Sequence, residues 1–169
     1  MSAIKKQTTT DSSQEITKGE EQVEHRSQNE NYEAIAQELI NTEPELKYIK
    51  DSRVKIAFLD SDQSKKADKD KLVLGECEKV AAKNKWAICY DFTITLFTPN
   101  LVGLSEAQIR IVLFHELLHV GIEPGADGDE VYSVRKHDLE DFKLIIDRFG
   151  TEWASKKKAG KCEGVSHGI

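Results

Sequence analysis

Residues 111–120 of this 169-residue chain read IVLFHELLHV, an apolar run that contains the pattern H-E-x-x-H. In a helix, residues four positions apart lie on the same face, so His115 and His119 can direct two imidazole nitrogens at one metal ion. Glu116 lies one position further round the helix. From there it can reach a water beside the ion without ligating the ion itself, as a general base must. The stretch therefore predicts a helix that carries a metal centre.

The flanking residues support this helix. Ser105 followed by Gln108 fits a capping box at its start, and Gly121 offers a stop. Apolar residues occur on several of its faces, which indicates a helix that is buried nearly all round. Buried ionisable groups need a partner or a metal ion. The alternative is that both histidines are core residues bonded to the backbone and that Glu116 faces solvent.

Length and composition indicate one domain. A chain of 19.1 kDa can bury one core but is short for two, and its polar residues are concentrated at the ends. We expect residues 1–28 to form a disordered polar tail, residues 29–153 the folded domain, and residues 154–169 a flexible tail rich in Lys and Gly.

Charge and cysteine content limit the partners and the compartment. The net charge of −6 and the pI near 5.4 disfavour binding of nucleic acid by the whole surface. Three cysteines, Cys77, Cys89 and Cys162, lack C-x-x-C spacing and suggest a reducing compartment. No apolar run approaches the ~18 residues of a membrane span. We therefore expect a cytoplasmic protein without a membrane partner.

Periodicity predicts an α+β fold, in which a small antiparallel or mixed sheet packs on the H-E-x-x-H helix between an N-terminal and a C-terminal helix. Apolar residues at helical spacing between Tyr32 and Ile40 indicate the first of these helices, which Glu43 and Pro44 end. A similar stripe over residues 139–149, followed by Gly150, indicates the last helix. Alternating residues predict strands over 54–59 and 86–96, and the apolar residues 72–74 start a further strand that continues to Val80.

The segment 86–96 gives the clearest alternation and predicts a long, bent antiparallel strand. If its polar side or its edge is open, it could hold an extended peptide across the metal ion. Cys89, Thr93 and Thr95 could then line the cleft. They could equally form the solvent face of the sheet.

A catalytic zinc site usually has three protein ligands, so one ligand must come from outside the helix. His137 is the preferred candidate, because it directly precedes a packed helix whose apolar stripe would fix its direction. Downstream residues of suitable chemistry also include Glu123, Asp127, Asp129, Glu130, Asp138 and His167. Tyr132 and Arg135 are near enough to His137 in sequence to stabilise an oxyanion, although either also suits a packing or surface role.

The order of these motifs resembles that of the phage metallopeptidase family, a small zincin-like group. The resemblance rests on the strand residues YDFTI at 90–94, on HELLH at 115–119 and on KHDLEDF at 136–142, and it covers about residues 30–150. It implies His115, His119 and His137 as zinc ligands, with Glu116 as the catalytic base. A looser similarity exists to SprT-like proteases, which also place a third histidine at the start of a later helix.

These observations lead us to expect a zinc metallopeptidase that acts on peptides or proteins. Two alternatives remain: an SprT-like protease recruited to DNA, for which the sequence offers no convincing DNA-binding surface, and a non-catalytic binding module that retains a structural zinc. The first alternative predicts salt-sensitive DNA binding that stimulates cleavage. The second predicts metal without turnover.

Overall fold

The computed structural model describes residues 24–68, 71–137, 142–151 and 153–154. The longest helices are α1 (Glu30–Thr42) and α4 (Glu106–Leu118), and the longest strands are β2 (Ile56–Ser61) and β4 (Phe92–Phe97). The remaining elements, in chain order, are β1 (Arg26–Gln28), η1 (Pro44–Leu46), α2 (Lys47–Lys50), β3 (Gly75–Lys79), η2 (Ala82–Asn84), α3 (Thr98–Leu101), β5 (Val120–Pro124), β6 (Glu130–Val134) and α5 (Lys143–Phe149).

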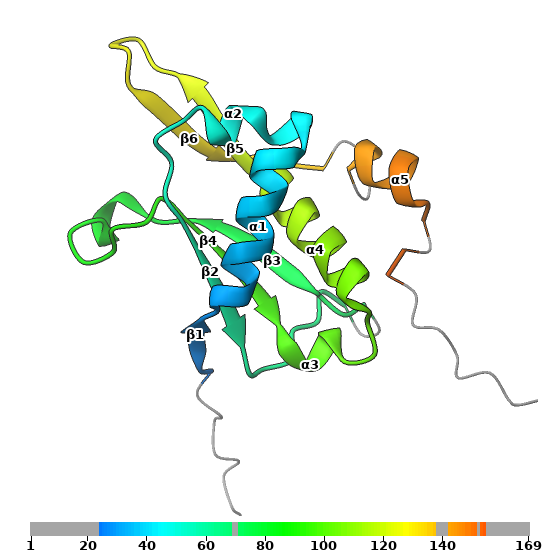
Figure 1. Cartoon of the computed structure of the whole chain (residues 1–169). Helices are drawn as coiled ribbons and strands as arrows, with labels where there is room; N and C mark the ends of the chain where they lie inside the picture. Colours follow the sequence, from blue (N-terminus) through cyan, green and yellow to red (C-terminus); the bar gives the residue numbers. More distant parts are fainter. Residues whose placement is uncertain (1–23, 69–70, 138–141, 152, 155–169) are drawn as a thin grey trace, which may run out of the picture.

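The main sheet has four strands in the order β1-β2-β4-β3, and a separate hairpin joins β5 to β6 (Figure 1). β2 and β4 run parallel, while β1 and β3 pair antiparallel with their neighbours. The predicted α+β fold with a small mixed sheet is confirmed, and it is compatible with a small zincin-like domain. β3 lies at one edge of this sheet.

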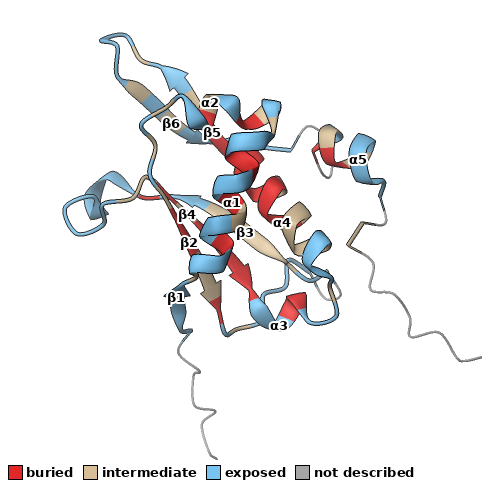
Figure 2. Ribbon diagram, in the orientation of Figure 1, coloured by how far each residue is buried: buried red, intermediate tan, exposed pale blue. Residues whose placement is uncertain are grey.

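One face of the sheet is covered by α1 and α4, which also pack against each other. The core is formed by the side chains that the sheet and the two helices direct toward each other. Figure 2 shows the buried residues concentrated where the sheet and the helices meet. α1 begins at Asn29, whose side chain accepts hydrogen bonds from the amides of Asn31 and Tyr32. Leu46 and Ile49, which follow α1, are buried against the same core.

The opposite face of the sheet carries an ion-pair cluster centred on Arg26 of β1. Its guanidinium contacts the carboxylates of Glu24, Glu76 and Glu78 and donates to the hydroxyl of Thr95. β1 lies inside the segment 1–28 that we expected to be a polar tail, so ordered structure begins before residue 29. Residues 1–23 and 155–169 lie outside the described part of the chain.

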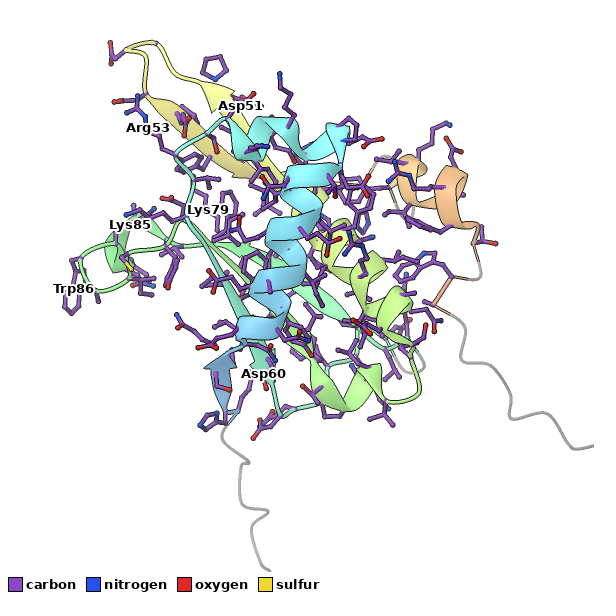
Figure 3. All side chains as sticks on the ribbon, in the orientation of Figure 1. Asp51, Arg53, Asp60, Lys79, Lys85 and Trp86 are labelled. Atoms are coloured by element: carbon purple, nitrogen blue, oxygen red, sulfur yellow. The ribbon has the colours of Figure 1, made fainter. Side chains whose placement is uncertain are left out.

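The long strand predicted over residues 86–96 is wrong in its first half. Within this segment, only the residues of β4 pair with other strands of the sheet. The amides of Ala87 and Ile88 instead both donate to the carbonyl of Asn84 in a turn. Trp86 lies at the tip of the loop between β3 and β4, with 88 % of its surface exposed (Figure 3). The alternation of apolar residues therefore continues past the end of the strand without marking a buried face.

The last helix is shorter at its start than predicted. α5 begins at Lys143 after the N-cap residue Phe142, and it ends at Gly150, whose φ of 79° confirms the predicted stop. Leu139, the first residue of the predicted stripe, lies outside the described residues. No helix within the described ranges is both long and apolar enough to cross a membrane.

The loop that leads into β3 is fixed by the buried side chain of Asn100 in α3. Its amide nitrogen donates to the carbonyls of Lys65 and Val73, at 2.8 and 2.6 Å, and its amide oxygen accepts from the Ser64 hydroxyl at 2.6 Å. Asn100 is only 2 % exposed, so removal of this side chain leaves buried polar groups without a partner.

We predict that Asn100→Ala lowers the free energy of unfolding by about 2 to 3 kcal/mol, measured by denaturant titration. Asn41→Ala is the matched control, because that exposed amide donates only to a carbonyl of its own helix. The control should change stability by less than about 0.5 kcal/mol. Equal effects of the two substitutions would contradict an anchoring role for Asn100.

Candidate metal centre

α4 begins with the capping box that the sequence predicts. The Ser105 hydroxyl accepts from the Gln108 amide, and the Gln108 side-chain oxygen accepts from the Ser105 amide. The helix then runs through the core, where its buried apolar residues are Val112, Leu113, Phe114, Leu117 and Leu118. Its last turn carries His115 and Glu116, and Glu116 is only 5 % exposed. The prediction of a helix buried on most of its faces is confirmed.

His119 is the C-cap of α4 rather than an interior residue, but its φ of −72° and ψ of −19° keep it helical. The spacing of four residues therefore still directs His115 and His119 to the same side. The predicted stop at Gly121 is wrong, because the chain passes from His119 directly into β5 and Gly121 lies inside that strand. Gly121 instead permits close packing, since a Cβ there would lie 2.6 Å from the Ser133 hydroxyl oxygen.

The β5–β6 hairpin returns the chain to the end of α4. Its register pairs Val120 with Val134, so the next residue, Arg135, comes to lie beside His119. Two hydrogen bonds fix this approach: the Arg135 amide donates to the His119 carbonyl at 2.7 Å, and the His119 Nδ1 donates to the Arg135 carbonyl at 2.7 Å. His137 follows two residues later and therefore faces the last turn of the helix.

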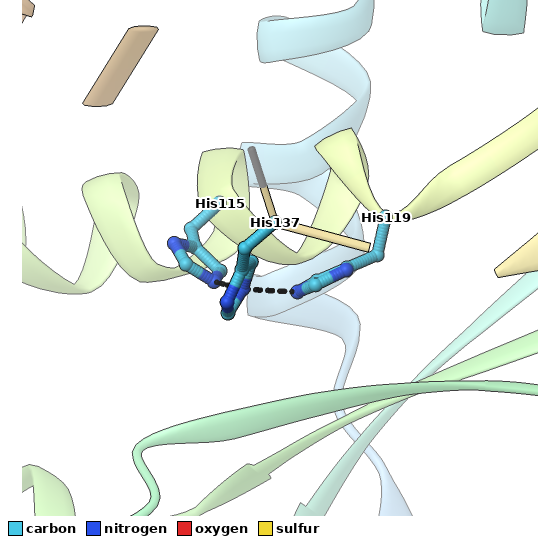
Figure 4. A group of neighbouring side chains, drawn as sticks. All are labelled: His115, His119 and His137. Atoms are coloured by element: carbon cyan, nitrogen blue, oxygen red, sulfur yellow. Dashed lines mark hydrogen bonds between the residues drawn. The ribbon is translucent and has the colours of Figure 1, made fainter. Parts of the chain in front are cut away.

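The three histidines converge on one point (Figure 4). His137 Nε2 lies 3.0 Å from His115 Nε2 and 3.0 Å from His119 Nε2, and the candidate ligand atoms of the three rings all lie within 4.8 Å of one another. Tetrahedral zinc with nitrogen ligands at about 2.0 to 2.1 Å separates those nitrogens by about 3.3 to 3.4 Å. The geometry therefore needs little adjustment to hold such an ion.

The chemistry of the donors also fits a metal ion. Because a carbonyl oxygen only accepts, the bond to Arg135 places a proton on His119 Nδ1 and leaves its Nε2 lone pair directed at the other rings when the ring is neutral. His137 Nε2 can then donate to His119 Nε2 or accept from His115 Nε2, but not both. A cation removes this conflict, because it accepts a lone pair from each nitrogen.

Phe142 supports all three imidazoles. Its ring centroid lies 5.2, 4.8 and 5.1 Å from those of His115, His119 and His137, in edge-on arrangements. It is buried and forms the N-cap of α5. An apolar ring in this position restricts the rotation of the histidine rings and keeps water from the side of the rings that it covers.

Glu116 lies against the edge strand β3. A Cβ at Gly75 would lie 3.0 Å from both Cγ and Oε1 of Glu116, so glycine leaves the room that the carboxylate occupies. His115, Glu116, His137 and Gly75 all line one cavity of about 560 Å³. An isolated glycine in a strand pattern is the only sequence signal that could have marked this position.

The other candidates for the third ligand lie elsewhere. Glu130 accepts from the Arg53 amide and from the Tyr132 hydroxyl, which turns Tyr132 away from the cavity as well. Among the described residues, the group that can share one ion consists of the three histidines. Asp138 and His167 lie outside the described residues.

Cys77 of β3 is near the site but is a poor ligand. Burial and then the charge of Glu116 raise the pKa of its thiol, which disfavours the thiolate that metal ions bind. Cys89, Thr93 and Thr95 do not line the cavity. Thr95 instead accepts from Arg26 on the helix-free face of the sheet.

A comparison with family models matches residues 24–161 to the family described as Putative phage metallopeptidase. The chain belongs to this family. The match extends beyond both ends of the region that carries the resemblance in sequence, and it includes β1. Searches of curated proteins and of solved structures found no match. Membership in a metallopeptidase family implies a bound metal, for which the histidine triad is a suitable site.

We predict that His137→Ala weakens zinc binding by at least about 100-fold, because it removes one of three converging nitrogens. Isothermal titration with zinc measures the change. His25→Ala is the matched control, since that exposed histidine lies before β1 and outside the triad. Unchanged affinity in His137→Ala would assign the third ligand to another residue.

Proposed function

We propose that this protein is a zinc-dependent metallopeptidase that hydrolyses peptide bonds, with His115, His119 and His137 as zinc ligands and Glu116 as general base. The observation that carries the proposal is the convergence of the three histidines, two of which line the same cavity as the buried carboxylate of Glu116. Family membership supports the same class of reaction. Zinc is the metal that best suits three imidazole ligands with one position left open.

When bound, zinc supplies Lewis acidity, which lowers the pKa of a coordinated water and polarises a carbonyl oxygen beside it. The three neutral imidazoles would hold the ion without neutralising its charge. His119 is oriented by its bond to Arg135, and all three rings are supported by Phe142. The chain thus supplies a preorganised ligand set at the wall of the cavity.

Glu116 takes the proton from the attacking water and returns it to the leaving amine. Its position suits this role because it neighbours His115 in α4 while its side chain is directed at Gly75 and the cavity. Glycine at position 75 leaves the space that this carboxylate occupies, since a Cβ there would lie 3.0 Å from its Cγ and Oε1. The carboxylate can therefore stay at the wall of the cavity, where one group must stand to serve both steps.

The substrate is an extended peptide or unfolded protein segment that adds to the edge of β3. Leu74 and Val80 bond to β4, since the Phe97 amide donates to the Leu74 carbonyl and the Val80 amide to the Asp91 carbonyl. The antiparallel register then directs the backbone groups of Gly75 and Cys77 away from β4, toward the open edge. β3 thus takes the role first expected of segment 86–96, in which the part that forms a strand, β4, lies between β2 and β3.

We predict that Glu116→Gln retains zinc and lowers peptide hydrolysis by about 100-fold or more, because the amide cannot accept the proton. Zinc content and cleavage of an unfolded protein substrate are measured together. Glu106→Gln, an exposed residue in the first turn of α4, is the control and should behave like wild type. If wild type and Glu116→Gln are equally inert although both hold zinc, the protein is a binding module instead.

We predict that Gly75→Ala lowers kcat by about 10-fold and leaves zinc affinity unchanged, because the added Cβ displaces the Glu116 carboxylate by a few tenths of an ångström. Turnover and zinc titration are compared on the same preparation, with unfolding as a check of the fold. Unchanged turnover would mean that the carboxylate does not need this space. A loss of zinc would mean that Gly75 supports the ligands rather than the base.

A further inference from the structure

We propose that the cavity beside the histidine triad selects substrates by a large apolar side chain next to the scissile bond. This inference rests on the proposed peptidase function and names the substrate class of that same site. Four parts of the described chain that are separate in sequence build the cavity: the approach to β3, the second half of α4, His137, and α5 with residues that follow it.

The walls of the cavity away from the histidines are apolar. They are formed chiefly by the side chains of Leu72, Leu74, Val112, Ile146 and Trp153. The polar side chains that line the cavity beside these walls are those of His115, His137 and Glu116 at one end, and the exposed Lys71 and Thr151. A side chain that enters the cavity from a peptide bound at the triad therefore exchanges water for apolar contacts.

Trp153 connects this apolar region to the reacting centre. Its indole lies 6.4 Å from the His115 ring, measured between centroids, and its carbonyl accepts a hydrogen bond from the Gln108 side chain at 2.7 Å. This bond ties the segment after α5 to the start of α4. The apolar wall thus begins where the scissile bond must lie, so the side chain it receives is adjacent to that bond.

The opposite wall is held by Asn100, which binds the carbonyl of Val73 between Leu72 and Leu74. The cavity of about 560 Å³ lies in the range of sites that bury most of a ligand's surface. Lys71 is exposed and solvated, so it offers little attraction to an acidic side chain. A charged side chain would lose its hydration inside the cavity without a buried partner to replace it.

The size of the expected preference follows from apolar burial. Burying a Leu or Phe side chain in place of Ala should raise kcat/KM by about 10-fold to 100-fold. Substrates with Asp or Lys at that position should be cleaved no faster than those with Ala. The preference should be confined to one position beside the scissile bond, because the cavity borders the triad on one side.

The test is a peptide mixture, varied at each position around one cleavage site, digested by the zinc-loaded full-length protein. Mass spectrometry of the products reports which residues flank the cleaved bond. Enrichment of Leu, Phe or Met at one adjacent position supports the inference. Cleavage without such enrichment, or enrichment of charged residues, overturns it while leaving the proposed peptidase function intact.

Variants of the cavity wall test which residues set the preference. Trp153→Ala should reduce the ratio of kcat/KM for Phe over Ala substrates by at least about 5-fold. Trp86→Ala is the matched control, because it removes an equally large but almost fully exposed indole on another loop. Where Trp153→Ala does not fold, Leu72→Ser makes the same test, since Leu72 is 40 % exposed in the wall, with the 67 % exposed Val102→Ser as its control.

A binding measurement separates this inference from the peptidase proposal. Zinc-loaded Glu116→Gln protein is titrated calorimetrically with two peptides that differ only by Phe or Ala at the selected position. If the wild type cleaves no peptide in the mixture, the digestion does not identify the selected position. In that case a series of peptides is used, in which Phe replaces Ala at each position of one sequence in turn. Tighter binding of a Phe peptide by about 10-fold supports the apolar cavity whether or not wild type shows turnover. Equal binding of the Phe and Ala peptides overturns it.

Discussion

The structure depends on the junction between the end of α4 and the end of the β5–β6 hairpin. His119 ends the helix, starts the hairpin and, through its carbonyl and its Nδ1, binds both backbone polar groups of Arg135. No loop separates the helix from β5, so the hairpin register alone decides which residue returns to the helix. That register places His137 opposite the other two histidines, so a slip of one residue would separate it from them.

Much of the site could be predicted because its information is local. The spacing of His115 and His119, the neighbouring Glu116 and the capping box at Ser105 are properties of one helix, and each has the predicted geometry. The approach of His137 to the other two was also predicted, since a metal site with two nitrogens is incomplete. His137 was preferred among several downstream residues because a packed helix was expected directly after it, but α5 begins only at Lys143. The register of the β5–β6 hairpin, which brings His137 to the end of α4, was not predicted from the sequence.

The parts that escaped prediction depend on neighbours distant in sequence. Alternation of apolar residues around Trp86 looks the same whether or not a partner strand lies beside it, and here the chain leaves the sheet before Phe92. Gly75 leaves room for the Glu116 side chain on another element, and an isolated glycine in a strand pattern does not reveal which side chain needs that room. Asn100 lies in α3, directly after β4, yet its side chain holds one wall of the cavity by binding the carbonyls of Lys65 and Val73, which are distant in sequence.

The triad is held in place by the backbone rather than by the histidines themselves. Two contacts of 3.0 Å at His137 Nε2 cannot both be hydrogen bonds between neutral rings, so these contacts stabilise the arrangement little without an ion. The helix, the hairpin and the Phe142 ring maintain it instead. A ligand set that is ordered before binding loses little entropy when the ion arrives, so more of the metal–nitrogen interaction remains as affinity. The fold thus orders these three side chains before any metal ion binds.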